Sequence, residues 1–171
     1  MPAGISKNPH GLGQIVADEV HARVHMGQFF SASYIDLTFT NAEVADLVLV
    51  FGGITHIQFD AGAGNDALFQ AYQGPAYSGG TPVVPQNHNR LSSLVSQNSL
   101  LTLPTVTDPG TLIENWVTYG GSGGRALGGS AGTFNEWIVP AGSFLFRCTN
   151  LTTNSGVLHV HFSWYEPTLV V

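Results

Sequence analysis

Apolar and polar residues alternate most regularly near the end of the chain. Between residues 157 and 165 every second residue is apolar, and histidine, serine and tyrosine fill most of the positions between them. Because side chains of a strand point alternately to its two faces, this pattern predicts a half-buried strand. Its predicted inward residues are Leu158, Val160, Phe162 and Trp164. Its predicted outward residues are His159, His161, Ser163 and Tyr165.

Two weaker alternations predict strands around residues 34–40 and 55–60. Between them, Asp46 is followed by a continuous apolar run over residues 47–51 that two glycines stop, which is typical of a strand buried on both faces or at a sheet centre. The positions that we expect to face inward in the two alternating segments are Ile35, Leu37, Phe39, Ile57 and Phe59.

Further short apolar segments bring the predicted strands to about nine, and they cover residues 67–72, 100–103, 112–119, 134–139 and 144–149. Pro140-Ala-Gly142 predicts a tight turn between the last two. Short strands separated by Gly, Pro and Asn favour an all-β sandwich or barrel over a helical or βαβ architecture. Residues 73–98 and 120–132 are rich in Gly, Pro, Asn and Ser and predict long loops.

The length of 171 residues fits one domain with an arm. We expect an N-terminal arm over residues 1–27 and a single β-sandwich domain over residues 28–171. Residues 15–25 favour either a helix or an extended segment, because valines interrupt an otherwise helical pattern. The N-terminus has no apolar core of a signal peptide, and no run of eighteen apolar residues occurs, so we expect neither secretion by a signal peptide nor a membrane span.

Charge is scarce in this chain. Charged residues make up 9% of it, against 43% hydrophobic residues, whereas about 25% charged is usual. Much of the surface is therefore expected to be neutral, either wetted by small polar groups or covered by other protein. The net charge of −6 with five Lys and Arg leaves little from which to build a phosphate-binding groove, so we do not expect nucleic acid as a partner.

The motifs that carry chemistry are weak. His159 and His161 would lie side by side on one strand face, but a metal needs a third ligand that the sequence does not place, and the acid-and-glycine pattern of cupin-type metal sites is absent. Cys148 alternates inward and is expected to be a core residue rather than a nucleophile. The loop at 121–125 lacks the ending of a P-loop. The sequon at Asn150 is discounted. We expect no enzyme, cofactor or bound metal.

Two polar segments are candidates for contact with a partner. The first segment, residues 21–25, is either a docking arm or an exposed segment without a special role. The second segment, residues 80–90, is stiffened by proline. It is either a tie between subunits or an internal network in which an arginine anchors the loop to its own domain. Their candidate contact residues are His21, Arg23 and His25 in the first and Asn87, Asn89 and Arg90 in the second.

Taken in order, several stretches resemble one family of viral proteins. They are His21-x-Arg23-x-His25-x-Gly27, Asp46-Leu-Val-Leu-Val with His56 and Phe59, Asn87-x-Asn89-Arg90, Glu136-Trp137, and Phe144-Leu-Phe-Arg147-Cys-Thr149-Asn150. Over roughly residues 15–167 the chain resembles the small β-rich virion proteins of tailed bacteriophages, in particular the capsid decoration, or cement, proteins.

The resemblance implies a jelly-roll-like sandwich that forms a homotrimer on the capsid exterior and clamps the major capsid protein, after assembly in the host cytoplasm. It implies contact through the two polar segments and carries over no catalytic residue. A tail- or fibre-associated virion subunit is the alternative within the virion. A carbohydrate-binding β-sandwich module and a cupin-like metalloenzyme are alternatives from other classes.

Overall fold

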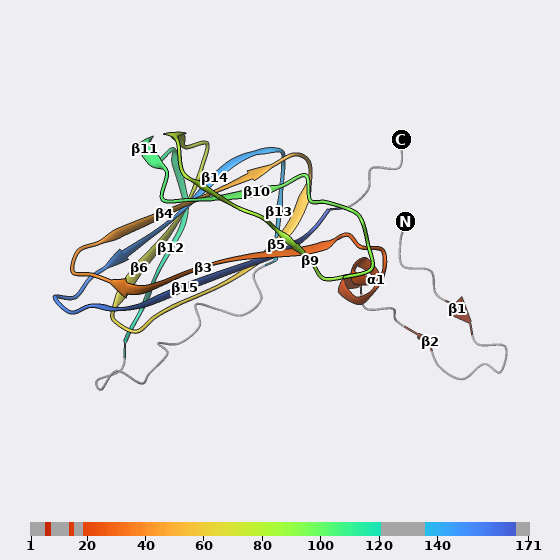
Figure 1. The fold of residues 1–171 in the computed structure, drawn as a ribbon, viewed down its shortest axis with the longest axis horizontal. Coiled ribbons are helices and arrows are strands. Elements are labelled where there is room, and N and C mark those ends of the chain that lie inside the picture. The colour runs from red at the N-terminus through yellow and green to blue at the C-terminus, as the bar shows by residue number, and fades with distance from the viewer. Residues whose placement is uncertain (1–5, 8–13, 16–18, 121–135, 167–171) are drawn as a thin grey trace.

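A computed structural model of the chain describes residues 6–7, 14–15, 19–120 and 136–166 (Figure 1). Strands dominate these residues, and the helix among them is α1, Glu19–His25. Two antiparallel sheets pack face to face, with β4 and β14 above β3 and β15 in the view of Figure 1. The predicted all-β antiparallel sandwich is therefore confirmed.

The larger sheet has six strands in the order β12-β6-β14-β4-β10-β8. They are β12 (Thr111–Thr118), β6 (Ala67–Gln73), β14 (Gly142–Asn150), β4 (Val44–Phe51), β10 (Ser99–Thr102) and β8 (Thr81–Val83). The second sheet has five strands in the order β13-β5-β15-β3-β9. They are β13 (Trp137–Val139), β5 (Thr55–Ala63), β15 (Gly156–Tyr165), β3 (Phe29–Phe39) and β9 (Gln86–Asn87). Two small pairs are β1 (Ser6–Lys7) with β2 (Gln14–Ile15) and β7 (Ala76–Ser78) with β11 (Thr105–Asp108).

The strands of the sandwich pair in nested order. β3 pairs with β15, β4 with β14, β5 with β13 and β6 with β12, all antiparallel. The chain thus forms one long double strand that is wound into two sheets, which is the jelly-roll arrangement. The expected jelly-roll topology is present.

Most predicted strands occur where the hydrophobic pattern placed them. The inward residues of β15 and the apolar run of β4 are buried, and Cys148 is fully buried in β14, where burial raises the pKa of its thiol. Gly142, the last residue of the predicted turn, begins β14 with a φ of +142° that suits glycine. Residues 73–98, expected as a long loop, also contain β7, β8 and β9.

The prediction for the inward face of β3 was wrong at two positions. Ile35 and Leu37 are 58% and 73% exposed, whereas Phe39 is 1% exposed and lies in the core as expected. Inward positions earlier in the strand are instead Phe30 and Ala32. The side chains that face the core therefore change from even to odd positions before Phe39.

A β-bulge causes this change. Leu158 of β15 lies opposite Asp36, but Gly156, two residues earlier, lies opposite Phe39, three residues later, so β3 holds one additional residue. The Asp36 carboxylate accepts hydrogen bonds from the backbone N and the hydroxyl of Thr38 at 2.8 and 3.3 Å. These bonds stabilise the irregular backbone at the bulge.

Aromatic rings fill the space between the sheets. The Phe146 ring lies 4.7 Å from that of Phe59, 4.9 Å from that of Phe162 and 6.2 Å from those of Trp116 and Trp137. Inward side chains of both sheets thus meet in one core. No helix within the described residues is long and apolar enough to cross a membrane.

The bulge leads to a testable prediction for two neighbouring side chains. We expect Leu37→Ala to change the free energy of unfolding by no more than about 0.5 kcal/mol, because its side chain is exposed. Phe39→Ala should cost about 3–5 kcal/mol, because it leaves a cavity in the core. Urea unfolding of both variants measures the difference, and a large loss for Leu37→Ala would contradict the register described here.

Candidate functional site

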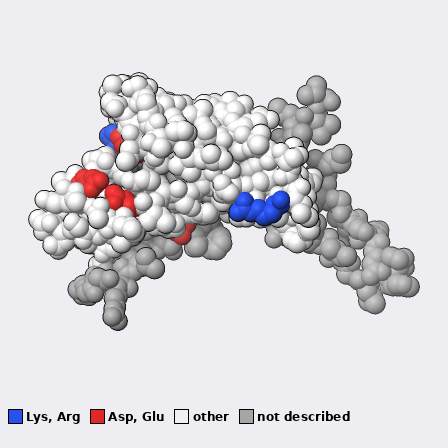
Figure 2. Space-filling view, viewed as in Figure 1, with Lys and Arg blue, Asp and Glu red and all other residues white. Residues whose placement is uncertain are grey.

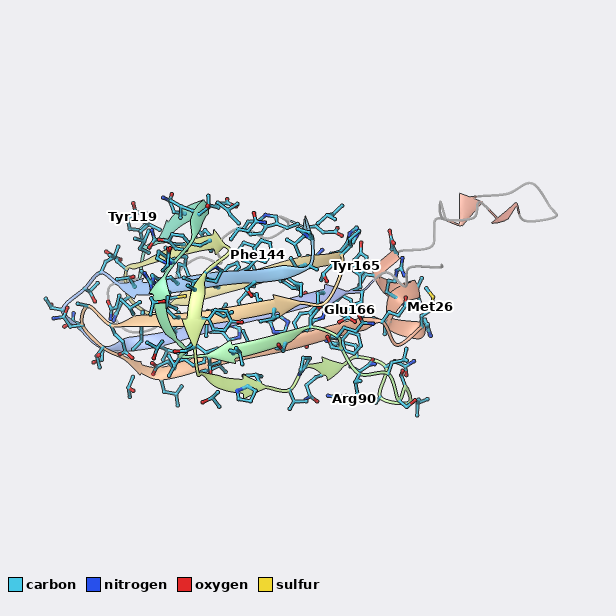
Figure 3. The ribbon with its side chains drawn as sticks, turned by 90° about the horizontal axis from the view of Figure 1, so that it is seen from above. Met26, Arg90, Tyr119, Phe144, Tyr165 and Glu166 are labelled. Atoms are coloured by element: carbon cyan, nitrogen blue, oxygen red, sulfur yellow. The ribbon has the colours of Figure 1, made fainter. Side chains whose placement is uncertain are left out.

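The structure brings the two predicted contact segments together at one end of the sandwich. The Asn87 side-chain amide donates hydrogen bonds to the backbone oxygens of Gly27 and Leu94 at 2.8 and 3.0 Å. The Asn89 amide donates to the backbone oxygen of His25 at 3.0 Å. Figure 3 shows Met26 and Arg90 at this same end. Segments about sixty residues apart in the chain thus form one surface.

Gly27 allows this close approach. Its N donates to the Val24 oxygen and the Gln28 N to the Arg23 oxygen, both at 2.9 Å, which ends α1 in a Schellman motif. Gly27 has a φ of +71°, and a Cβ at this position would overlap the side chain of Ser92. The loop between β9 and β10 therefore packs directly against the end of the helix.

The two arginines of the segments have partners within the chain. Arg23 donates to the Glu19 carboxylate at 3.2 Å and to the Gln28 side-chain oxygen at 2.8 Å. Arg90 donates to the Gln86 side-chain oxygen at 2.9 Å. Arg90 therefore bonds to its own loop, and the asparagines tie that loop to α1. An internal network is thus present, and the role of these residues in contact with a partner stays a prediction.

His21 and His25 lie one turn apart on α1, with their Nε2 atoms 3.1 Å from each other. Both side chains are exposed. They therefore stand at the surface, where a partner can reach them.

Exposed apolar side chains surround these polar groups. Leu91 and Val95 are 99% and 84% exposed, and Met26, Ile54 and Leu94 are about half exposed. We call these five residues the α1-end surface. A cavity of about 480 Å³ opens among them, with Ile54, Leu94 and Val95 in its lining. The hydrophobic pattern did not mark this surface, since apolar residues in loops have no periodicity.

Glu166 fixes the loop that carries this surface. Its carboxylate accepts hydrogen bonds from the Ser96 hydroxyl, from the Trp164 indole N at 3.1 Å and from the backbone N of Gln97 at 3.1 Å. The Asn98 side chain accepts from the backbone N of Gly52 at 2.9 Å. The loop is therefore anchored over the core, and the apolar side chains are presented on a fixed backbone.

A second polar cluster lies on the outer face of the five-stranded sheet. The Tyr165 hydroxyl lies 2.6 Å from the Glu136 carboxylate and 2.8 Å from His56 Nδ1. The bond from Tyr165 lowers the pKa of Glu136, with His56 adding to the effect, and burial raises the pKa of Tyr165. Tyr165 faces outward as predicted, but His56 stacks on its ring at 4.4 Å and Arg23 lies over it. The cluster thus ties β5, β13 and β15 to α1.

His159 and His161 project from the same face, with ring centres 6.4 Å apart. His161 Nδ1 lies 2.8 Å from the Ser33 hydroxyl. In the part of the chain that the structure describes, no three His, Cys, Asp or Glu side chains are placed to hold a metal ion. Burial lowers the pKa of His161, and the nearby His159 and His88 lower it further, against an opposing effect of Asp60.

Two other segments were singled out in the sequence, the sequon at Asn150 and the glycine-rich loop at 121–125. Asn150 is buried, and its amide donates to the backbone oxygens of Phe39 and Asn154 at 3.0 Å each, so in the folded chain it cannot accept a glycan. The glycine-rich loop at 121–125 lies outside the described residues, as do residues 134–135 of the expected strand over 134–139.

The fold and this geometry define a jelly-roll β-sandwich protein whose strongest candidate site is a contact surface. No protein-family model, curated protein or solved structure matches the chain. The function is therefore inferred from the residues and their arrangement alone.

The anchoring of the α1-end surface can be tested through Asn87. We expect Asn87→Ala to lower the free energy of unfolding by about 1–3 kcal/mol, because it leaves the backbone oxygens of Gly27 and Leu94 without their donor. Amide hydrogen exchange should accelerate in the loop 88–98. Asn115→Ala, on an exposed position of β12, serves as the control and should change stability by less than about 0.5 kcal/mol. Unchanged exchange in the loop would contradict the anchoring.

The environment of His161 predicts a pH dependence of stability. Because its folded pKa is lowered, the unfolded chain binds the proton first as the pH falls through the ordinary value of 6.5, so the unfolded state gains stability relative to the folded state. We expect the free energy of unfolding to be lower at about pH 5 than at about pH 7.5, and His161→Asn to reduce this difference. His88, whose pKa is also lowered, should preserve part of it.

Urea midpoints at the two pH values measure the effect. The Asn side chain can still accept a hydrogen bond from the Ser33 hydroxyl, so the variant removes the titratable group and keeps this contact. His159→Asn leaves the burial of His161 unchanged and should keep most of the pH dependence. If the free energy of unfolding differed between the two pH values by the same amount in the wild type and in His161→Asn, His161 would be ruled out as a source of the pH dependence.

Proposed function

We propose that this protein is a structural subunit of a tailed-bacteriophage virion, a capsid decoration protein that binds the outside of the major capsid lattice and stabilises the head. The observation that carries the proposal is the α1-end surface, a group of exposed apolar side chains on an anchored backbone. Such side chains are costly to leave in water, and a group of them at one end of a domain is typical of a site of protein contact.

The composition of the rest of the surface supports the same function. Most of the face shown in Figure 2 is formed by residues that are neither acidic nor basic. A neutral surface gives little long-range repulsion between copies, which favours packing in a symmetric lattice. The proposal therefore includes a homotrimer on the capsid exterior, in which many weak contacts add up.

The fold is compatible with this function but does not determine it. Jelly rolls occur in viral capsid proteins, lectins and cupins. A sugar-binding face would need several exposed aromatic rings side by side. Of the three tyrosines near loop ends, Tyr119 is 74% exposed, but Tyr72 and Tyr77 are partly buried. The order of polar segments that resembles decoration proteins, including Asn87 to Arg90, favours the virion over the other classes.

The proposal predicts that the α1-end surface binds capsid shells. Shells assembled from the major capsid protein of the phage that encodes this chain, and lacking decoration, should bind the purified protein saturably in a sedimentation assay. The double variant Leu91→Asp with Val95→Asp should bind at least about tenfold more weakly, because charges replace apolar contacts. Leu37→Asp, at a position on β3 that is 73% exposed, is the control and should bind as the wild type does.

Light scattering of the free protein should give three times the mass of one chain. Failure of the wild type to bind shells, or undiminished binding by the double variant with an unchanged melting temperature, would refute the proposed role of this surface.

A further inference from the structure

His21 and His25 differ from the other histidines in the described part of the chain. Their Nε2 atoms lie 3.1 Å from each other, and their ring centres are 4.5 Å apart. The rings of His159 and His161, the pair that the sequence marked, have centres 6.4 Å apart, and His161 bonds to a serine instead. The two α1 nitrogens are therefore close enough either to share a hydrogen or to bind one ion.

The separation of the two nitrogens matches that of two ligands on one metal ion. Zinc–imidazole bonds measure about 2.0–2.1 Å, so two nitrogens on one ion lie about 2.9 Å apart at a right angle and about 3.3 Å apart at the tetrahedral angle. The observed 3.1 Å lies between these values. Two histidines with a spacing of four residues on one helix face also bind zinc in the metalloprotease motif H-E-x-x-H. Both nitrogens can thus reach one ion without a change of the backbone.

The backbone that carries the pair is held from the other side of the helix. Residues two positions apart on a helix point about 200° apart, so Arg23 lies opposite both histidines. Its guanidinium group lies over the Tyr165 ring, 5.5 Å from the centre, and donates to Gln28. The Asn89 amide donates to the backbone oxygen of His25 at 3.0 Å. The cation of α1 therefore points away from the pair, and the helix is fixed in place.

The hydrogen bond between the two rings is compatible with metal binding. In the neutral pair, one Nε2 carries a hydrogen and the other accepts it. A metal ion needs a lone pair on both nitrogens, and the donating ring supplies it by moving its hydrogen from Nε2 to Nδ1. Each imidazole then still carries one hydrogen, and the ion takes the place of the shared one between the rings.

The pair supplies only part of a coordination shell. Structural zinc sites have four protein ligands, whereas no third His, Cys, Asp or Glu side chain joins the pair within the described residues. Both side chains are exposed, so water reaches the remaining positions. The affinity of such an open site comes from chelation, because the first imidazole to bind holds the ion at a high effective concentration near the second.

We propose that His21 and His25 form an open chelating site for a divalent transition-metal ion that prefers imidazole ligands, of the class of Zn²⁺, Ni²⁺ and Cu²⁺. Water completes the coordination. Ions that prefer oxygen ligands, such as Mg²⁺, do not bind there. The site uses none of the apolar side chains of the α1-end surface and does not depend on the proposed function.

Zinc titration of the isotope-labelled full chain, without a histidine tag, tests the site. Zn²⁺ should shift the imidazole NMR signals of His21 and His25 with a stoichiometry of one ion per chain, and Mg²⁺ should not. Amide hydrogen exchange over residues 19–25 should slow, because the ion binds the folded helix and joins two of its turns. Cu²⁺ should displace Zn²⁺, since it binds nitrogen ligands more tightly. These comparisons use the wild type alone.

Variants test whether both imidazoles are needed. His21→Ala and His25→Ala should each lower the Zn²⁺ affinity at least about tenfold, because chelation is lost. Alanine at these exposed helical positions should preserve the fold. His25→Ala combined with Met26→His keeps two imidazoles but turns them about 140° apart on the helix, so it should bind as weakly as the single variants. His159→Ala is the control outside α1 and should leave the affinity unchanged.

Several results would overturn the proposal. One is the absence of a shift of either imidazole at about 1 mM Zn²⁺, at which even a site with a Kd of that size is half filled. Another is full affinity in an alanine variant or in the variant with altered spacing, since chelation by the pair would then not be the cause. Loss of affinity in His159→Ala would place the ion on the outer face of the five-stranded sheet instead.

Discussion

The pairing of β3 with β15 is the constraint on which the rest of the structure depends. β15 lies between β3 and β5 in the five-stranded sheet, so the last strand of the sandwich is hydrogen-bonded both to β3, its first long strand, and to β5. Every other pair of the jelly roll is nested inside this one. The same pairing supports the α1-end surface, because β3 begins shortly after α1 and β15 ends directly before Glu166. The Glu166 N donates to the Gln28 oxygen at 3.2 Å. Most contacts are consequently distant in sequence, and such a topology is expected to fold slowly.

The hydrophobic pattern was sufficient for strands that remain regular. It placed β15 and both of its faces correctly, because no irregularity interrupts the alternation from Leu158 to Trp164. It was wrong for Ile35 and Leu37, because the β-bulge shifts the inward positions of β3 and the hydropathy of the segment does not mark a bulge. It predicted that Tyr165 faces outward, but it could not show that His56 and Arg23 cover the Tyr165 ring, since these contacts join residues far apart in the sequence.

The candidate site was predictable in its polar residues and not in its apolar ones. Asn87 and Asn89 stood out because asparagine amides in a proline-stiffened loop need partners, and these amides do bond to Gly27 and His25. That the loop would meet α1 required the fold. Leu91 and Val95 carry no signal in the sequence, because a single apolar residue in a loop looks the same whether it is buried or exposed. Glu166 was missed for a similar reason, since nothing in its surroundings marks one acid as an anchor.

The few acids of this chain also stabilise its local structure. Most described carboxylates are used within the chain, where Asp46 pairs with Arg147, Asp66 accepts from the backbone N of Gly120, and Glu166 anchors the loop of the α1-end surface. Each such acid stabilises local structure, and the charge of Asp46 is also balanced by Arg147. With so few ionic groups on the exterior, cover by other protein, as we propose, would stabilise it by removing its apolar side chains from water.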